Sequence, residues 1–226
     1  MKRLEELYMG IAAVLMAGCF SEAAVEDEVE DELTVASVDF ESYPTGLVGS
    51  PWTVTSAGSA STVRVVGTTD HGHVLLLRGG TAVPDYVIAA LGISSASTEI
   101  TAQVDINPAS DASFLWSLHG AGTSIGRRRI RLQREPGSTA LIANTVPGGN
   151  SACGTLPSNQ WSQITLRVHA QGWPHTFDVL IDGARTACTG LPTGLGPPFR
   201  SIDVMDASNE GWGGEVRFDN LAVATP

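Results

Sequence analysis

Lysine is almost absent from this chain of 226 residues: Lys2 is the only one, and every other basic residue is an arginine. The 13 basic residues face 24 acidic ones, which leaves a formal net charge of -11 at pH 7. No aromatic side chains interleave with the arginines, so the chain lacks the basic, aromatic-lined surface typical of nucleic-acid binding, and we expect no nucleic-acid partner. The three cysteines have no metal-ligand spacing, which argues against a structural zinc site.

Sustained helical periodicity is missing as well. From residue 35 to residue 226, short β-rich runs recur between clusters of Gly, Pro, Ser and Asn. We expect strands near Ser37–Glu41, Trp52–Thr55, Thr62–Val66, Val74–Arg78, Tyr86–Leu91, Glu99–Ile106, Ser113–Leu118, Arg128–Arg134, Ala140–Asn144, Gln163–His169, Thr176–Ile181, Ser201–Met205 and Glu215–Val223. So many short strands predict an all-β fold: one domain, residues 35–226, built as a two-sheet antiparallel β-sandwich or jelly roll.

The N-terminus has the pattern of an export signal. Lys2 and Arg3 precede a stretch of apolar and small residues, Leu7 to Gly18, that is too short to span a bilayer but has the length of a signal-peptide core. The next residue is Cys19, and "LMAGC" resembles the lipobox of bacterial lipoproteins, in which the cysteine is acylated. The resemblance implies that residues 1–18 are a lipoprotein signal peptide and that lipid on Cys19 is the only membrane attachment. An ordinary secretory signal is the alternative.

Residues 19–34 hold seven acidic residues and no basic one. Such a run repels itself and cannot bury a core, so we expect an acidic disordered tether. Phe20 follows the cysteine where, by the same lipoprotein resemblance, an aspartate would mark retention at the inner membrane. We therefore expect an outer-membrane or cell-surface lipoprotein, or a periplasmic or secreted protein if Cys19 is not lipidated.

Cys153 and Cys188 remain as a pair once Cys19 is set aside. In an exported, oxidising context two such cysteines favour a disulfide. Two buried free thiols are the alternative.

Four segments carry a resemblance to a known fold: "VDFESYPTGLVGSPW", "LPSNQWSQITLRVHA", "TFDVLIDGARTAC" and "GEVRFDNLAVAT". They resemble the concanavalin A-like, laminin-G-like jelly rolls of bacterial exported proteins. The resemblance implies that the first and last strands pair, which brings Asp39 near Asp219. These two carboxylates and neighbouring carbonyls are candidate ligands for a structural calcium ion, since calcium prefers hard oxygen ligands. The fold hosts lectins, glycosidases, lyases and adhesion modules, so it specifies architecture more than function.

Catalytic motifs of that fold are missing. The resemblance implies a Glu-x-Asp-x-x-Glu strand for a glycosidase, which needs two carboxylates across the scissile bond, and a Gln-Ile-His strand for a lyase. Neither pattern occurs, and Arg167-Val168-His169 is the nearest to the second. We therefore lean toward a non-catalytic protein. If it is a divergent polysaccharide lyase or glycoside hydrolase instead, His119, His169 or Tyr86 would transfer protons.

The arginine-rich segment "GRRRIRLQRE" is the most distinctive candidate for ligand binding. Alternation along a strand puts Arg129, Arg131 and Gln133 on one face, opposite Ile130 and Leu132. A row of guanidinium groups matches carboxylate or sulfate groups in bidentate geometry. The alternative is a solvated row paired with acids on neighbouring strands, which contributes little.

Two tryptophans, Trp173 and Trp212, lie in Gly-rich loops, where each is either a lid on the core or a platform for a sugar ring. With the arginine row, they suggest a lipid-anchored, exported, non-catalytic module that binds carbohydrate or acts in adhesion, with a polysaccharide or cell-surface glycan, acidic glycans among them, as the candidate ligand. A protein–protein interaction domain is the remaining alternative, and burial of both tryptophans would favour it.

Overall fold

The structure is a computed structural model, and it describes residues 33–58, 61–80, 86–121, 129–146, 148–206 and 214–226. The described residues contain no helix that is long and apolar enough to cross a membrane. The predicted signal peptide (1–18), Cys19, nearly all of the predicted tether and Trp212 lie outside the described residues. The signal peptide and the lipidation site therefore stay predictions.

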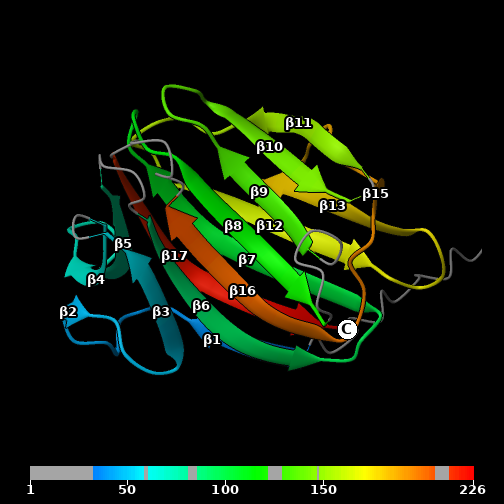
Figure 1. Cartoon of the computed structure of the whole chain (residues 1–226), viewed down its shortest axis with the longest axis horizontal. Helices are drawn as coiled ribbons and strands as arrows, with labels where there is room; N and C mark the ends of the chain where they lie inside the picture. Colours follow the sequence, from blue (N-terminus) through cyan, green and yellow to red (C-terminus); the bar gives the residue numbers. More distant parts are fainter. Residues whose placement is uncertain (1–32, 59–60, 81–85, 122–128, 147, 207–213) are drawn as a thin grey trace, which may run out of the picture. The chain divides into compact units, whose positions relative to one another are not determined.

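The described strands form two antiparallel sheets (Figure 1). The ten-stranded sheet has the order β14 (Ala184–Arg185), β13 (His175–Ile181), β12 (Ser162–His169), β7 (Glu99–Pro108), β17 (Gly214–Thr225), β5 (His73–Gly79), β4 (Thr62–Gly67) and β2 (Gly46–Leu47), with β1 (Leu33–Val38) paired to β17 and β15 (Leu191–Thr193) paired to β13. The seven-stranded sheet has the order β11 (Gly149–Thr155), β10 (Ala140–Thr145), β9 (Arg129–Arg134), β8 (Phe114–Gly120), β16 (Phe199–Asp206), β6 (Tyr86–Ser95) and β3 (Trp52–Ala57).

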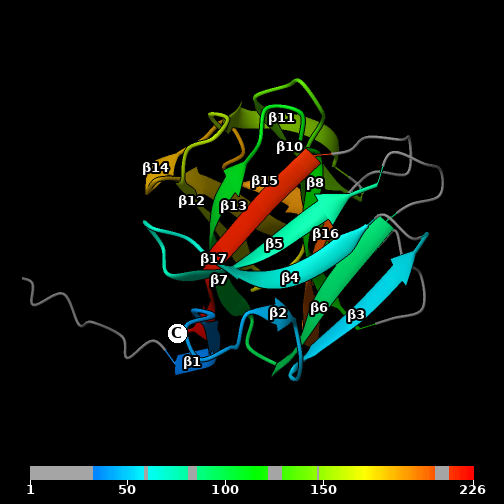
Figure 2. The same cartoon turned by 90° about the vertical axis from the view of Figure 1, so that its left-hand side faces the viewer.

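The two sheets pack face to face as layers. Figure 2 separates them, with β12, β13 and β17 on one side and β16, β6 and β3 on the other. Along β7 every second residue is buried, and on β8 Trp116 is 1% exposed while its neighbour Leu115 is only half-buried. Each large apolar side chain removed from water in this way contributes about 1.5–3 kcal/mol. The predicted all-β, two-sheet antiparallel β-sandwich is confirmed.

Some boundaries differ from the sequence prediction. β1 begins at Leu33, so the last two residues assigned to the tether pair with Ala224 and Thr225 at the end of β17. β11 was not predicted as a strand, because Gly149, Asn150 and Gly154 are residues typical of turns. The structure pairs β11 with β10 as an edge strand, where fewer backbone hydrogen bonds have to be satisfied.

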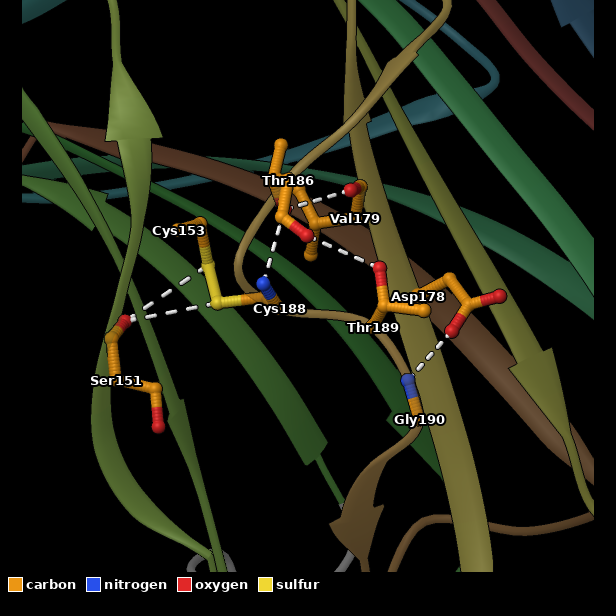
Figure 3. The surroundings of a disulfide bond; sticks show 8 residues. All are labelled: Ser151, Cys153, Asp178, Val179, Thr186, Cys188, Thr189 and Gly190. Atoms are coloured by element: carbon orange, nitrogen blue, oxygen red, sulfur yellow. Dashed lines mark hydrogen bonds between the residues drawn. A yellow bond between two sulfur atoms is a disulfide. The ribbon is translucent and has the colours of Figure 1, made fainter.

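A disulfide joins Cys153 to Cys188, as predicted (Figure 3). Cys153 lies in β11 of the seven-stranded sheet, and Cys188 lies in the segment between β14 and β15 of the ten-stranded sheet. That segment is also tied to β13, because the Thr186 hydroxyl donates to the Val179 carbonyl at 2.7 Å and the Cys188 amide donates to the Thr186 hydroxyl at 3.1 Å. The disulfide therefore links the two sheets at one edge of the sandwich.

Candidate functional site

β9 positions the polar row that the sequence predicts. Its residues alternate between half-buried and fully buried, with Ile130 and Leu132 in the core. Arg129, Arg131 and Gln133 therefore point away from the core, onto the outer face of the seven-stranded sheet. This orientation agrees with the prediction, whereas their role in binding is not decided by it.

Strand register brings residues from distant parts of the chain beside this row. Arg131 lies between Asn144 of β10 and Ser117 of β8, and Ser117 lies opposite Asp203 of β16. Arg129 lies opposite His119, which lies opposite Ser201. We call this surface the arginine face, and its polar members on β10, β9, β8 and β16 are Asn144, Arg129, Arg131, Gln133, Ser117, His119, Ser201 and Asp203.

The charges on the arginine face are unevenly paired. His119 Nε2 lies 3.0 Å from Asp203 Oδ2, an ion pair when the imidazole is protonated. Within the described residues neither Arg129 nor Arg131 has a carboxylate oxygen within 4.0 Å. Arg131 Nε and Asp203 Oδ1 are buried and have no hydrogen-bond partner among the described residues. The alternative of a solvated row paired with neighbouring acids therefore finds no support in the described part of the chain.

Burial acts on both guanidinium groups. It lowers the pKa of Arg131, and the adjacent charge of Arg129 lowers it further. Burial also lowers the pKa of Arg129, while the Asp203 carboxylate opposes this shift. A guanidinium starts from so high a pKa that both side chains stay charged at neutral pH. The arginine face thus holds two half-buried cations that have no carboxylate oxygen within 4.0 Å in the described residues, while Asp203 acts on Arg129 from further away.

Arg134, the last arginine of the strand, has a different environment. It shares the inner side of β9 with Ile130 and Leu132 and is 1% exposed. Its guanidinium donates to the Ser138 carbonyl, to the Ala109 carbonyl at 3.2 Å and to the Ser158 hydroxyl at 2.6 Å. Arg134 therefore joins three connecting segments of the sandwich and is not available to a ligand.

Trp173 is the described loop tryptophan, and it is 74% exposed. It lies in the β12–β13 hairpin, where its ring meets the His175 ring edge-on with 5.2 Å between centroids. His175 Nδ1 lies 2.8 Å from the carbonyl oxygen of Leu195. Leu195 belongs to the segment that leads into β16, and the start of β16 pairs with the end of β8. Trp173 is therefore exposed, at the end of the sandwich that also carries His119 and Arg129.

The three candidates for proton transfer lie apart from one another. His119 is on the arginine face. His169 is on the outer face of the ten-stranded sheet, 3.7 Å from Glu99 Oε1 and 3.4 Å from Asp178 Oδ2. Tyr86 is the first residue of β6. Gly92 of β6 and His119 of β8 both lie opposite Ser201 of β16, so Tyr86 is about 20 Å from His119 along the strand direction. Only His119 can act together with the arginine row.

The predicted calcium ligands lie near the predicted strand pairing. β1 and β17 are antiparallel neighbours with Val38 opposite Leu221, which confirms that pairing. Asp219 is 3% exposed, its Oδ2 lies 3.1 Å from His71 Nδ1, and its Oδ1 accepts from the Asn220 amide. Asp39 is exposed and accepts from the Glu41 amide. No three His, Cys, Asp or Glu side chains are grouped to hold a metal ion in the described residues, so calcium would depend on backbone carbonyls, and its binding stays a prediction.

His71 also fixes the turn between β4 and β5. Its ring stacks on Trp161 with 3.9 Å between centroids, and Trp161 Nε1 donates to Asp70 Oδ2 at 2.9 Å. This hydrogen bond is the main cause that lowers the pKa of Asp70. For Asp219 the largest effect is burial, which raises its pKa against the opposing hydrogen bond from His71. These contacts hold the turn in place.

No protein-family model and no curated protein matches the chain. Solved structures do match. A sialidase is 15% identical with a TM-score of 0.64 over 83% of this chain, but the match spans only 18% of the sialidase. A carbohydrate esterase from the Shiga toxin-encoding bacteriophage phi24B is 13% identical (TM-score 0.62, 86% of this chain and 99% of that one). An endo-β-1,4-glucuronan lyase from the fungus Trichoderma reesei is 12% identical, with a TM-score of 0.57; the match covers 85% of this chain and 96% of that one.

Identities this low show a shared fold and nothing of shared activity. The two antiparallel sheets, the pairing of the first strand with the last and the likeness to these structures agree with one another. The chain folds as a concanavalin A-like jelly-roll domain.

Proposed function

We propose that this protein binds carbohydrate that carries acidic groups, and that the arginine face is the binding surface. The observation that carries the proposal is the pair Arg129 and Arg131, adjacent on one face, half-buried and without a carboxylate partner in the described residues. Partly desolvated cations without an anion are costly, and a ligand carboxylate or sulfate would offset that cost through bidentate hydrogen bonds.

Neighbouring groups suit a sugar. Asn144, Gln133 and Ser117 add amide and hydroxyl groups that can both donate and accept hydrogen bonds. Structures similar to this chain include, by their names, a sialidase, a carbohydrate esterase and the carbohydrate recognition domain of Emp47p. The exposed ring of Trp173 could stack on a sugar at the end of the face. Its exposure also argues against the alternative of a protein–protein domain with buried loop tryptophans.

Binding is tested with residues 20–226 on an array of neutral, uronate and sulfated glycans. Arg129→Gln with Arg131→Gln is expected to lower the affinity for acidic glycans at least about tenfold, since each lost bidentate contact to an ionised group is worth about 1.5–3 kcal/mol. Arg64→Gln with Arg185→Gln is the matched control, because it makes the same charge change at two exposed arginines of the ten-stranded sheet. Equal affinity of both double variants would exclude the arginine face.

The location of the protein is part of the proposal. Acylation of Cys19 would anchor the chain to the outer membrane or cell surface, and the acidic tether would hold the domain away from it. Mass spectrometry of the mature N-terminus tests this: a diacylated or triacylated Cys19 is expected. An unmodified N-terminus produced by a cut elsewhere would show a secreted or periplasmic protein.

A second candidate function is β-elimination on a uronate, and the contact between His119 and Asp203 favours it. Asp203 holds one ring nitrogen of His119, and Arg129 lies opposite on the next strand. Arg129 would neutralise the uronate carboxylate while His119 takes the proton from the adjacent carbon; a carbon–carbon double bond forms as the glycosidic C–O bond breaks, and the leaving oxygen takes up a proton from the protonated His119 or from water. Unsaturated products from a polyuronate that disappear in His119→Ala would establish this activity, and binding without products would exclude it.

A further inference from the structure

A row of apolar side chains runs beside the arginines on the outer face of the seven-stranded sheet. Its members come from β10, β8, β16 and β6: Ile142, Leu115, Met205 and Ile88. Gln133 of β9 completes the row, because Ile142 lies opposite Gln133, Gln133 opposite Leu115, Leu115 opposite Met205 and Met205 opposite Ile88. We call these four apolar side chains the apolar row.

The apolar row does not belong to the core. All four side chains are half-buried, and their neighbours along each strand are the ones that face the opposite sheet. The outer face of the other sheet is different: on β7 it carries Thr101, Gln103, Asp105 and Asn107. An antiparallel sheet with one solvated face normally shows such polar residues there. Apolar side chains in register across several strands are therefore a feature that needs an explanation.

The two rows have a fixed geometry. Arg131 and Gln133 are two residues apart on β9, so the apolar row runs parallel to the row of Arg131 at a distance of about 7 Å. From Ile142 to Ile88 the apolar row crosses four strand spacings, which is about 19 Å. A linear ligand that lies across the strands on the apolar row can therefore contact Arg131 in the adjacent row and reach Arg129, which lies one row further along β9.

Sugar rings usually meet aromatic platforms, and this face has none at its centre. On β10, β9, β8 and β16 no Phe, Tyr or Trp points outward in the described residues, because Phe114 and Trp116 point into the core. A bare polyuronate would satisfy the arginines and leave the apolar row in contact with hydroxyl groups. Methyl groups on the ligand would instead bury the apolar row and remove it from water.

We propose that the preferred ligand is an acidic glycan with acetyl substituents, whose acidic groups lie on Arg129 and Arg131 and whose acetyl methyl groups lie on the apolar row. This proposal rests on the proposed function, because it concerns the same face. Charge complementarity indicates the kind of ligand. The apolar row lies beside Arg131 and Arg129, which fits a ligand that carries both anionic groups and methyl groups.

The test compares a polygalacturonate with the same polymer after chemical O-acetylation, which keeps the carboxylates and adds methyl groups. Residues 20–226 are titrated with each polymer at the same salt concentration. We expect the acetylated polymer to bind about fivefold tighter or more, since each acetyl methyl group that is buried against the apolar row adds to the affinity. Mild alkaline removal of the acetyl groups is expected to reverse the gain.

A variant links the gain to the apolar row. Leu115→Asn with Met205→Gln is expected to abolish the preference, so that both polymers bind with about equal affinity. The double substitution replaces two apolar contacts by polar groups at nearly constant volume. Leu47→Asn is the matched control, since Leu47 is 82% exposed and lies in the ten-stranded sheet. It should keep the full preference. Unfolding curves of all variants establish that each is folded.

The outcomes separate the two proposals. Equal binding of both polymers, with loss of binding in Arg129→Gln and Arg131→Gln, would overturn the acetyl preference and keep the proposed function. A preference for the acetylated polymer that survives in Leu115→Asn with Met205→Gln would also overturn the role of the apolar row. Absence of binding to either polymer and to every other acidic glycan would overturn both proposals.

Discussion

Arg129 lies directly opposite His119 across the β8–β9 pair, and His119 in turn contacts Asp203 at 3.0 Å. Asp203 thus acts on one cation of the arginine face: its carboxylate opposes the downward shift of the Arg129 pKa. The face therefore combines two unpaired arginines with one carboxylate that weakens their attraction for anions.

Asp203→Asn should strengthen the binding of acidic glycans. Removal of one negative charge about 10 Å from Arg131, two strands away, makes the potential at the face more positive, which predicts an affinity about two- to threefold higher at low salt. Calorimetric titration of the wild type and the variant with one acidic glycan measures the change. Weaker binding by Asp203→Asn would mean that the carboxylate itself contacts the ligand.

Arg134→Met should destabilise the fold strongly. The substitution keeps an apolar stem but removes donors to Ser138, Ala109 and Ser158. We expect a loss of about 3 kcal/mol in the free energy of unfolding, because the variant loses three hydrogen bonds of a charged donor and leaves half-buried acceptors without this partner. Urea unfolding measures it, and Arg185→Met, at an exposed arginine, is the control that should change little. A loss below about 1 kcal/mol would contradict this role.

Removal of the disulfide should also lower stability. Cys153 and Cys188 are 35 residues apart, and closing a loop of that length stabilises the folded state by about 3–4 kcal/mol on the chain-entropy model. Cys153→Ser with Cys188→Ser is therefore expected to lower the denaturant midpoint clearly, and a reductant should lower the midpoint of the wild type in the same way. Unchanged midpoints would show that the hydrogen bonds of residues 185–190 hold the two sheets together without the disulfide bond.

Asp219 makes stability depend on pH. Burial raises the pKa of Asp219 in the folded state, so its contribution to stability is present at low pH and is lost as pH rises through that pKa. His71 and Asp105 face Asp219: the hydrogen bond from His71 lowers the pKa of Asp219 and the charge of Asp105 raises it, but burial has the largest effect. As pH rises from about 4 to about 7, Asp219→Asn should therefore become more stable relative to the wild type.

Urea unfolding of both proteins at the two pH values measures this difference. Asp111→Asn serves as the control, since it removes one carboxylate at an exposed position. A difference that shifts toward the wild type as pH rises would contradict the burial effect.

The sequence predicts those features that depend on local alternation. Ile130 and Leu132 reveal which side of β9 faces the core, so the outward direction of Arg129 and Arg131 follows from the sequence alone. The same parity places Arg134 inside. Its acceptors lie on separate connecting segments, however, and only the packed structure shows that they meet one guanidinium.

Contacts between strands that are distant in the chain could not be predicted from the sequence. His119 and Asp203 meet because β8 and β16 are neighbours in the seven-stranded sheet, and strand order is not encoded in alternation. The apolar row was missed for the same reason: only the strand register shows that Ile142, Leu115 and Met205 lie side by side on the outer face. The consecutive apolar residues 114–116 and 141–143 were a signal that both faces of these strands carry apolar side chains.

The most direct test of the account is the salt dependence of glycan binding by the wild type and by Arg129→Gln with Arg131→Gln. If the two arginines hold acidic groups, the wild-type affinity should fall at least about tenfold between about 0.05 M and about 0.5 M NaCl, and the variant should bind weakly at both concentrations. Tight binding that is independent of salt, or equal for the two proteins, would contradict the assignment of the arginine face.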